Sequence, residues 1–275
     1  MYFAMDEIGF ENMEEIMKIS NESGKWRFIY DAARTYGFDG IHITPSLYKN
    51  FGVDYRNVPE YFRDFKLTLH LGGIHSVTSE KEYETLDEEL ETGFEIAAEY
   101  GMHDISIHPP YLIRLTQAEK DLSYEFFHKL VSKWVKTAVT SGISLSLETH
   151  VYGKAFLFGG YGEFANFVNN YPDLSVLIDI SHNYYDPPYS EDEIIDFAGR
   201  NNIKGLHISD ALRDKEYQES LHLAIGDGII DFPRLLKGFE KFLDLYGVLE
   251  IKANNAGIQK SLNYLKGLCN GHHHI

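Results

Sequence analysis

The chain has a single cysteine, Cys269, among its 275 residues. One thiol cannot build a disulfide framework, and it excludes a zinc site made from several thiolates. Basic residues are also few, with 25 Lys and Arg against 42 Asp and Glu, so the formal net charge is −17. Such an acidic balance disfavours a protein that binds nucleic-acid phosphates through a large positive surface.

Long apolar runs and linker segments are missing as well. No stretch approaches the roughly 18 apolar residues of a membrane-spanning helix. The first ten residues, MYFAMDEIGF, lack the apolar length of a secretory signal, and no run of Pro, Gly and Ser divides the chain. We therefore expect a soluble, cytoplasmic protein with one domain over residues 1–270 and a disordered tail at 271–275.

Short apolar segments alternate along the chain with amphipathic helical segments. The predicted strands span residues 39–44, 66–71, 104–109, 143–149, 175–181, 203–209 and 247–252, with a weaker strand at 2–5. This alternation predicts βαβ units and a parallel sheet. Eight such units would close a (β/α)8 TIM barrel. An open doubly wound sheet is the alternative, but the first strands are followed by no glycine-rich dinucleotide fingerprint.

Within the predicted strands, apolar and polar side chains alternate. In residues 143–149, for example, Leu145 and Leu147 lie on one face, and Ser146 and Glu148 lie on the other. An apolar outer face would pack against helices, and a polar inner face would line the barrel. The pattern therefore predicts a site at the carboxyl-terminal mouth of the barrel, where enzymes of this fold place catalysis.

Six predicted strands end on the inner face with a histidine or an acidic residue. These residues are His70, His108, Glu148, Asp179, His207 and Glu250. Three carboxylates gathered at one mouth cannot all stay ionised without a positive charge among them. We therefore expect a divalent metal, and mixed imidazole and carboxylate ligands suit Zn, Mn, Co or Fe better than Mg. Taken singly, each residue could instead be a hydrogen-bonded core residue.

Five short motifs carry a resemblance to a known family. They are LET at 147–149, IDISH at 178–182, GLHISD at 205–210, HLAIGDGIIDF at 222–232 and VLEI at 248–251. In this order they resemble the xylose-isomerase-like TIM barrels, which include sugar and sugar-phosphate isomerases and epimerases as well as endonuclease IV. The resemblance is specific for this superfamily and much less specific for one reaction.

The resemblance implies a role for each matching residue. Glu148, Asp179, His207 and Glu250 match the four ligands of the single catalytic metal of the isomerases and epimerases. Glu148 and Glu250 would also form the acid–base pair. Possible additional metal or substrate ligands, by resemblance to the three-zinc cluster of endonuclease IV, are His70, His108, His182 and His222.

One position departs from the endonuclease IV pattern. Ser220 stands where that family has an aspartate, two residues before His222. The neighbouring Glu219 would supply a carboxylate only with a different geometry. One metal is therefore expected, with up to three allowed by the remaining ligands.

Other features leave two interpretations open. Arg213 resembles a substrate-contacting arginine of the epimerases, but it also fits a solvated loop. Lys252 would bind an anionic substrate group or neutralise Glu250, and neutralisation is favoured. Gly226 and Gly228 precede a helix start and would hold a phosphate or form an ordinary capped turn.

Several tyrosines lie in segments that follow the strands. They are Tyr111, Tyr152, Tyr161, Tyr184 and Tyr185. Together with the glycines of residues 156–164 they would form a mobile aromatic lid over a sugar, or they would pack on the barrel rim. No role is assigned to His75, His103, His128 or His150.

The leading hypothesis is a metal-dependent sugar or sugar-phosphate isomerase or epimerase. It would transfer a proton through a metal-bound enediolate, with His182 holding a substrate oxygen. The alternative is an endonuclease IV-like zinc phosphodiesterase acting at abasic sites in DNA, which the extra histidines favour and the acidic charge disfavours. A third class covers other chemistry at the same metal, or binding without turnover. The expected partner is a small-molecule substrate, and a homo-oligomer is compatible with the sequence.

Overall fold

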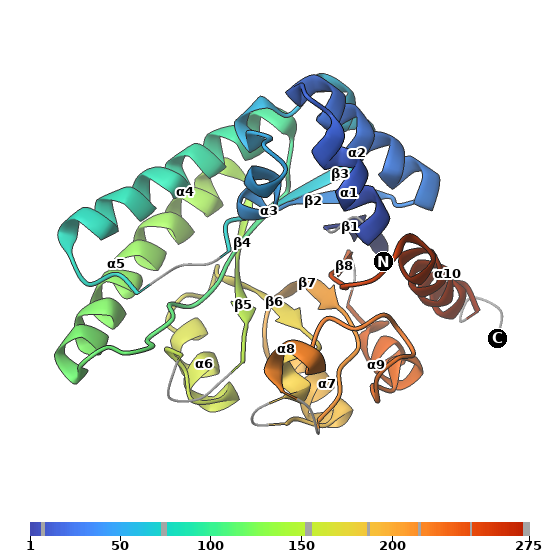
Figure 1. Ribbon diagram of the computed structural model, residues 1–275. Helices are drawn as coiled ribbons and strands as arrows, with labels where there is room; N and C mark the ends of the chain where they lie inside the picture. The colour runs from blue at the N-terminus through green and yellow to red at the C-terminus, as the bar shows by residue number, and fades with distance from the viewer. Residues whose placement is uncertain are drawn as a thin grey trace.

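The computed structural model describes residues 1–6, 9–72, 76–151, 156–185, 188–213, 216–242 and 244–271. Its strands are β1 Tyr2–Met5, β2 Gly40–Ile43, β3 Lys66–His70, β4 Asp104–Ile107, β5 Ser144–Thr149, β6 Ser175–Asp179, β7 Ile203–Ile208 and β8 Tyr246–Leu249. They pair in chain order, all parallel, and β8 closes on β1 (Figure 1). The predicted (β/α)8 barrel is confirmed.

Helices connect successive strands and surround the barrel (Figure 1). They are α1 Phe10–Lys18, α2 Glu22–Tyr36, α3 Pro45–Asn50, α4 Glu80–Tyr100, α5 Gln117–Ser141, α6 Tyr161–Val168, α7 Glu191–Arg200, α8 Tyr217–Ser220, α9 Phe232–Phe239 and α10 Asn255–Gly271, with 3-10 turns η1 Tyr55–Asn57, η2 Glu60–Asp64 and η3 His182–Tyr184. None of the helices described here is long and apolar enough to cross a bilayer.

Of the expected tail at residues 271–275, only Gly271 is among the described residues. Gly271 was assigned to the tail, but it is the last residue of α10. The rest of that segment, residues 272–275, lies outside the described residues. The single-domain boundary at residue 270 stays a prediction.

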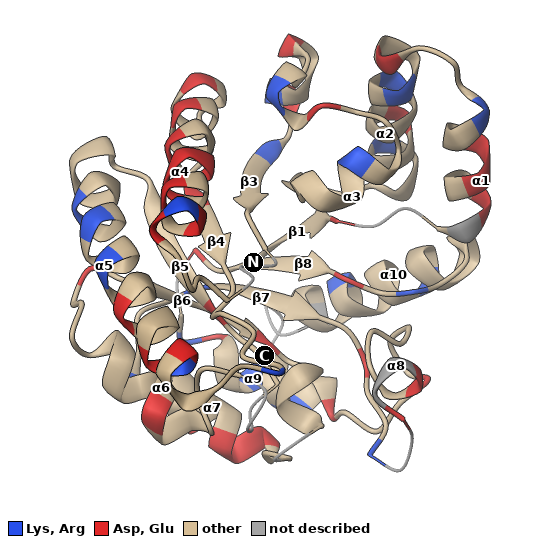
Figure 2. Ribbon diagram, turned by 60° about the vertical axis from the view of Figure 1, so that its left-hand side comes forward, with Lys and Arg blue, Asp and Glu red and all other residues tan. Residues whose placement is uncertain are grey.

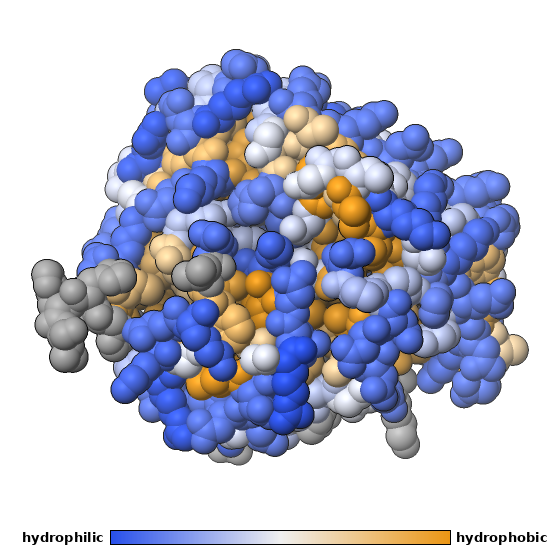
Figure 3. All heavy atoms as spheres, turned by 180° about the vertical axis from the view of Figure 1, so that it is seen from behind, coloured by the Kyte–Doolittle hydropathy of each residue, from blue (hydrophilic) through white to orange (hydrophobic). Residues whose placement is uncertain are grey.

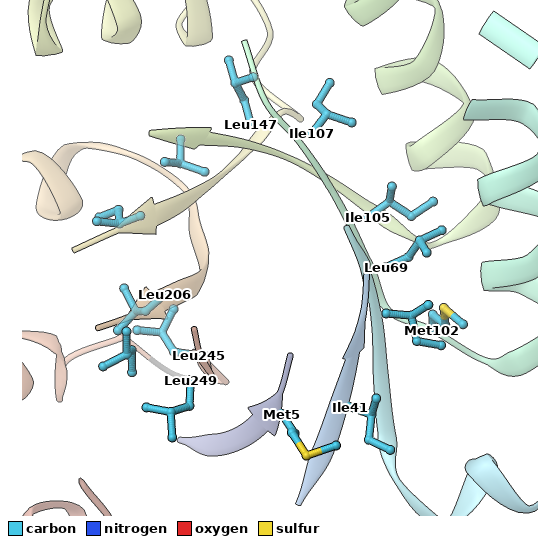
Figure 4. Close-up of a cluster of buried hydrophobic side chains, with 14 of the residues drawn as sticks. Met5, Ile41, Leu69, Met102, Ile105, Ile107, Leu147, Leu206, Leu245 and Leu249 are labelled. Atoms are coloured by element: carbon cyan, nitrogen blue, oxygen red, sulfur yellow. The ribbon is translucent and has the colours of Figure 1, made fainter. Parts of the chain in front are cut away.

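The alternation of side chains within the strands produces two different faces. Ile41, Leu69 and Ile105 are fully buried, and Figure 4 shows them on the outer side of the strands, toward the surrounding helices. Inner-face residues such as Thr68 and Ser146 are also fully buried, and they are polar. The apolar face therefore holds the barrel against its helices, and the polar face is left for hydrogen bonding inside the barrel.

Three predicted strands run two or three residues too far, among them 175–181, which ends at Asp179; in the other two the difference concerns a site residue. The segment 104–109 forms a strand only to Ile107, and the segment 247–252 only to Leu249. His108 and Glu250 are therefore the first residues after their strands. Both side chains lie at the rim of the barrel, and the backbone amide of Glu250 still donates a hydrogen bond to the Ile208 carbonyl of β7.

Candidate metal centre

Four predicted ligands meet at the carboxyl-terminal mouth of the barrel. Glu148 lies on β5, Asp179 ends β6, His207 lies on β7, and Glu250 follows β8. The parallel register pairs Asp179 directly with His207. One ligand atom from each of the four residues lies within 4.8 Å of the others. We call these residues the four-ligand group.

Within the four-ligand group, the ring of His207 lies among the carboxylates. Its Nδ1 is 3.1 Å from Glu148 Oε1 and 2.9 Å from Glu250 Oε2. The Oδ2 of Asp179 is 4.0 Å from the same nitrogen. Glu148, Asp179 and His207 are at most 1% exposed, whereas the side chain of Glu250 is 23% exposed. Glu250 is therefore the member that faces the open side of the mouth.

The three carboxylates of this group repel one another. Burial, together with the charges of Glu250 and Glu148, raises the pKa of Asp179 well above its usual value. Asp179 Oδ1 accepts hydrogen bonds from Ser181 Oγ and the His182 amide. Its buried Oδ2 accepts none from any described residue. A buried carboxylate oxygen without a donor, beside two further carboxylates, fits a bound cation.

A second set of possible ligands lies beside Glu148. His108 Nε2 is 2.8 Å from Glu148 Oε2, and His70 Nε2 is 3.6 Å from the same oxygen. The other ring nitrogen of His70 is 2.9 Å from Ser106 Oγ. Burial opposes ionisation of Glu148, but His108 and His207 more than offset it and hold the pKa of this carboxyl well below its usual value. The two oxygens of Glu148 therefore face two neighbouring ligand groups.

A third set lies beside Asp179. His182 Nδ1 is 3.4 Å from Asp179 Oδ2, and its Nε2 is 3.3 Å from His222 Nε2. His222 also has its Nδ1 3.7 Å from Glu250 Oε1. Asp179, His182 and His222 form a group that could hold a metal. Glu148 and Asp179 are thus each shared between two groups.

Ser220 is the departure that the sequence indicated. Its side chain is fully buried, and its Oγ finds no hydrogen-bond partner in the described part of the chain. The adjacent Glu219 is exposed, and the group of Asp179, His182 and His222 contains neither residue. Among the described residues this third set therefore has three protein ligands, and Ser220 does not supply the carboxylate expected at its position.

The two cationic residues predicted to bind substrate are both exposed. The guanidinium of Arg213 lies 5.4 Å from the centre of the Tyr184 ring and donates a hydrogen bond to the Tyr189 carbonyl. The backbone amide of Lys252 donates to the His222 carbonyl. Neither side chain forms an ion pair with the four-ligand group as described, so their roles toward a substrate stay predictions.

The glycine loop does not offer its amides to a phosphate. Gly226 N and Gly228 N donate to Asp210 Oδ2 at 2.9 and 3.0 Å. Ala211 N and Ile230 N donate to the other oxygen of the same carboxylate. The phosphate interpretation is therefore wrong for these two amides, because an internal anion already occupies them.

The aromatic segment proposed as a lid packs its phenylalanines against the core. Phe158 and Phe164 are buried, and Tyr161 begins α6 and stacks on Tyr189 with ring centres 3.9 Å apart. Tyr184 is 1% exposed. The expected lid tyrosine Tyr152 lies outside the described residues. Packing on the barrel rim is therefore the better description of the described tyrosines in this region.

Two further histidines, to which the sequence motifs do not point, lie against the candidate ligands. His42, on β2, has its Nε2 3.2 Å from His207 Nε2. His150 follows β5 and lies between His108 and His182, with ring centres 4.9 and 4.4 Å away. Strand alternation places both on the inner face, which is the signal that could have found them.

The chain belongs to the xylose isomerase-like TIM barrel family, whose family model matches residues 30–268. It is similar to "Probable endonuclease 4" of Staphylococcus aureus, with 26% identity over 228 residues, which cover 65% of this chain and 76% of that protein.

Two solved structures share the fold. A D-tagatose 3-epimerase-like protein gives a TM-score of 0.72 at 17% identity and covers 98% of this chain and 97% of its own. An IolI protein with a bound zinc atom gives a TM-score of 0.72 at 15% identity, also with 98% and 97% coverage. At these identities the likeness shows the fold alone.

Proposed function

We propose that the protein is a cytoplasmic, divalent-metal-dependent isomerase or epimerase that acts on a sugar or sugar phosphate. The four-ligand group carries this proposal, because three carboxylates and one imidazole converge there and Asp179 Oδ2 has no donor among the described residues. Family membership and the likeness to a D-tagatose 3-epimerase-like structure support it.

Glu148, Asp179, His207 and Glu250 would hold the metal, and this ligand set suits Zn, Mn, Co or Fe. A divalent ion bound there supplies Lewis-acid stabilisation of the negative charge that develops on a substrate oxygen when the adjacent carbon loses its proton.

The two glutamates differ in access, which gives them different parts in proton transfer. Glu250 is partly exposed and would take the proton from a substrate carbon. Glu148 is 1% exposed on the inner side of the mouth. It would have to take up a proton before giving one to the opposite face of the substrate carbon, and Glu250 would release its own proton to solvent to restore the pair. His182, which is hydrogen-bonded through its backbone to Asp179, would hold a substrate oxygen.

The test is carbon-bound hydrogen exchange in D₂O. Protein loaded with Zn, Mn or Co is incubated with a panel of ketoses, aldoses and their phosphates, and proton NMR follows the position next to the carbonyl. We expect exchange with at least one compound, and its loss on chelation and in Glu250→Gln. Metal-loaded protein that leaves every compound unexchanged would contradict the proposal.

One observation favours a second candidate, a metal-dependent phosphodiesterase related to endonuclease IV. The groups around His70 and His182 share Glu148 and Asp179 with the four-ligand group, and multinuclear centres of this kind suit phosphoryl transfer. The Staphylococcus aureus relative points the same way.

Two measurements separate the candidates. Incubation with a duplex that contains one abasic site should give nicks only if the second candidate holds. The metal content should be one per chain for the isomerase and two or three for the phosphodiesterase. In the isomerase, His108→Asn should leave that single metal in place. Stoichiometric nicking together with three metals would replace the isomerase proposal.

A further inference from the structure

His42 touches the candidate metal centre without belonging to the four-ligand group. It lies on β2, its side chain is fully buried, and its Nε2 is 3.2 Å from His207 Nε2. The contact is on the side of the His207 ring that faces away from Glu148 and Glu250, whose oxygens face Nδ1. His42 therefore lies behind His207 as seen from the carboxylates.

The surroundings of His42 fix the orientation of its ring. The β2–β3 register pairs His42 with Thr68, and His42 Nδ1 is 2.6 Å from Thr68 Oγ1. On another side the ring of His70 stacks on it, with centres 5.3 Å apart and an angle of 26° between the planes. Because both nitrogens of His42 have partners, a flip of the ring would break two contacts.

The position of the ring proton of His207 then suggests a function for His42. A metal bound at Nδ1 of His207 leaves the single ring proton of that neutral imidazole on Nε2, which faces His42. We propose that His42 is a positioning residue that accepts this N–H and holds His207 in the orientation that binds the metal. The proton of His42 is then on Nδ1, where it donates to Thr68 Oγ1. This inference rests on the metal centre of the proposed function.

The choice of an imidazole as acceptor fits the charge of the site. Metal-binding histidines often donate to a carboxylate, but the four-ligand group already contains three carboxylates within a buried space. A fourth negative charge next to them would add repulsion and a desolvation cost. A neutral imidazole supplies the acceptor without that charge.

The test compares three variants of the full chain. His42→Phe keeps a ring of similar size but removes the acceptor, and His42→Gln keeps an acceptor oxygen. The matched control is His103→Phe, because His103 precedes β4 at the opposite end of the barrel and contacts Tyr2 Oη. Zinc affinity is measured by competition with a chelator, the Co(II) absorption spectrum reports ligand geometry, and thermal unfolding of the metal-free proteins reports stability.

We expect His42→Phe to bind zinc about 10–100-fold more weakly and to change the Co(II) spectrum. His42→Gln should restore most of the affinity, and His103→Phe should match the wild type. If His42→Phe keeps wild-type affinity and spectrum, the positioning role is overturned. The positioning role is also overturned if the zinc affinity of His42→Phe falls only as much as its metal-free stability does, and His42→Gln does not restore the affinity.

Two other outcomes have a defined meaning. Ring nitrogens of His42, His70 and His207 lie within 4.8 Å of one another, so these imidazoles could themselves hold an ion. Loss of one whole metal equivalent in His42→Phe, with the remaining metal bound as in the wild type, would replace the positioning role by such a site. Wild-type protein that binds no divalent metal would overturn the proposed function, and the role of His42 with it.

Discussion

The carboxylate of Asp179 shows, at the level of one residue, why a cation would stabilise the mouth of the barrel. Ser181 and the His182 amide satisfy one oxygen, and the other faces His182 Nδ1 at 3.4 Å and His207 Nδ1 at 4.0 Å. Two glutamate charges act on it in a buried position. A divalent ion would convert this repulsion into attraction.

Asp179→Asn should separate metal binding from folding. The amide keeps the oxygen that accepts from Ser181 and His182 and removes the charge that Glu148 and Glu250 repel, so metal-free stability should stay equal or rise. A metal at 100 times its Kd adds about 2.7 kcal/mol to wild-type stability, and the variant should lose most of that gain. Thermal unfolding with zinc and with chelator measures both.

The exposed Asp173→Asn, in the loop before β6, is the control and should keep the full zinc gain. An Asp179→Asn protein that zinc stabilises as strongly as the wild type would contradict Asp179 as a ligand.

Asp104 is a second buried carboxylate, at the other end of the barrel interior. It accepts hydrogen bonds from Tyr246 Oη at 2.5 Å and Ser146 Oγ at 2.7 Å. Burial nevertheless raises the pKa of Asp104 from 3.8 to about 6. The folded state therefore holds this proton more tightly than the unfolded state does, and stability falls as the pH rises from about 4 to about 6.

Asp104→Asn should remove this pH dependence. A shift of two pKa units corresponds to about 3 kcal/mol, so the wild type should lose roughly two thirds of that relative to the variant between pH 4 and pH 6, and a little more by pH 7. Urea unfolding at pH 4, 5, 6 and 7 with chelator present measures the difference. Parallel curves for the two proteins would contradict the assignment.

At this scale the sequence predicts some site residues and misses others for a physical reason. Alternation within one strand places Glu148 and His207 on the inner face. The contact between His207 and His42 forms because the closed barrel brings the side chain of His42, on β2, next to that of His207, on β7. The sequence pattern of a single strand does not show this contact. Arg213 depends on loop conformation, which side-chain alternation does not describe.

At the scale of the elements, the buried side chain of Asp210 holds the segment between β7 and α9 together. Asp210 is 1% exposed and accepts from four backbone amides. A pair of backbone hydrogen bonds joins Asp210 to Leu223, next to His222, which has a φ of 61°. The aspartate therefore holds together the loop that carries a candidate ligand.

Asp210→Ala should destabilise the protein strongly. Hydrogen bonds to a charged group contribute roughly 1.5–3 kcal/mol each, so the loss of four should cost at least about 3 kcal/mol even after the loop relaxes. Urea unfolding measures the change. The control is Asp227→Ala, an exposed aspartate of the same loop, which should be nearly neutral. Equal effects of the two substitutions would show that the amides do not depend on Asp210.

The elements themselves were largely predictable. Their order follows from alternating strand and helix patterns, and α4 is capped at its end by Gly101, whose φ of 66° suits a glycine. Strand ends were less predictable, because the residues after Ile107 and Leu249 continue the alternating pattern beyond the last residue of each strand. The sequence could not choose between the two interpretations of the glycine loop, because it does not show that Asp210 reaches the amides of that loop.

At the scale of the whole molecule, the surface is acidic. Asp and Glu line the outward side of α4 (Figure 2), and hydrophilic side chains cover most of the face seen in Figure 3, with apolar patches between them. With a net charge of −17, the field of the molecule favours cations and small ligands over a polyanion. The charge thus bears directly on the choice between the two candidate functions.

We expect no salt-dependent binding to a duplex that contains an abasic site. A protein that neutralises several phosphates loses affinity steeply with salt, with a slope of about −0.9 per phosphate in a double logarithmic plot. Fluorescence anisotropy of a labelled duplex, with metal-loaded protein between 50 and 300 mM salt (roughly the range over which such losses are seen), should show no such loss. A slope corresponding to several phosphates would mean that local positive charge at the mouth overcomes the global field, and would favour the phosphodiesterase.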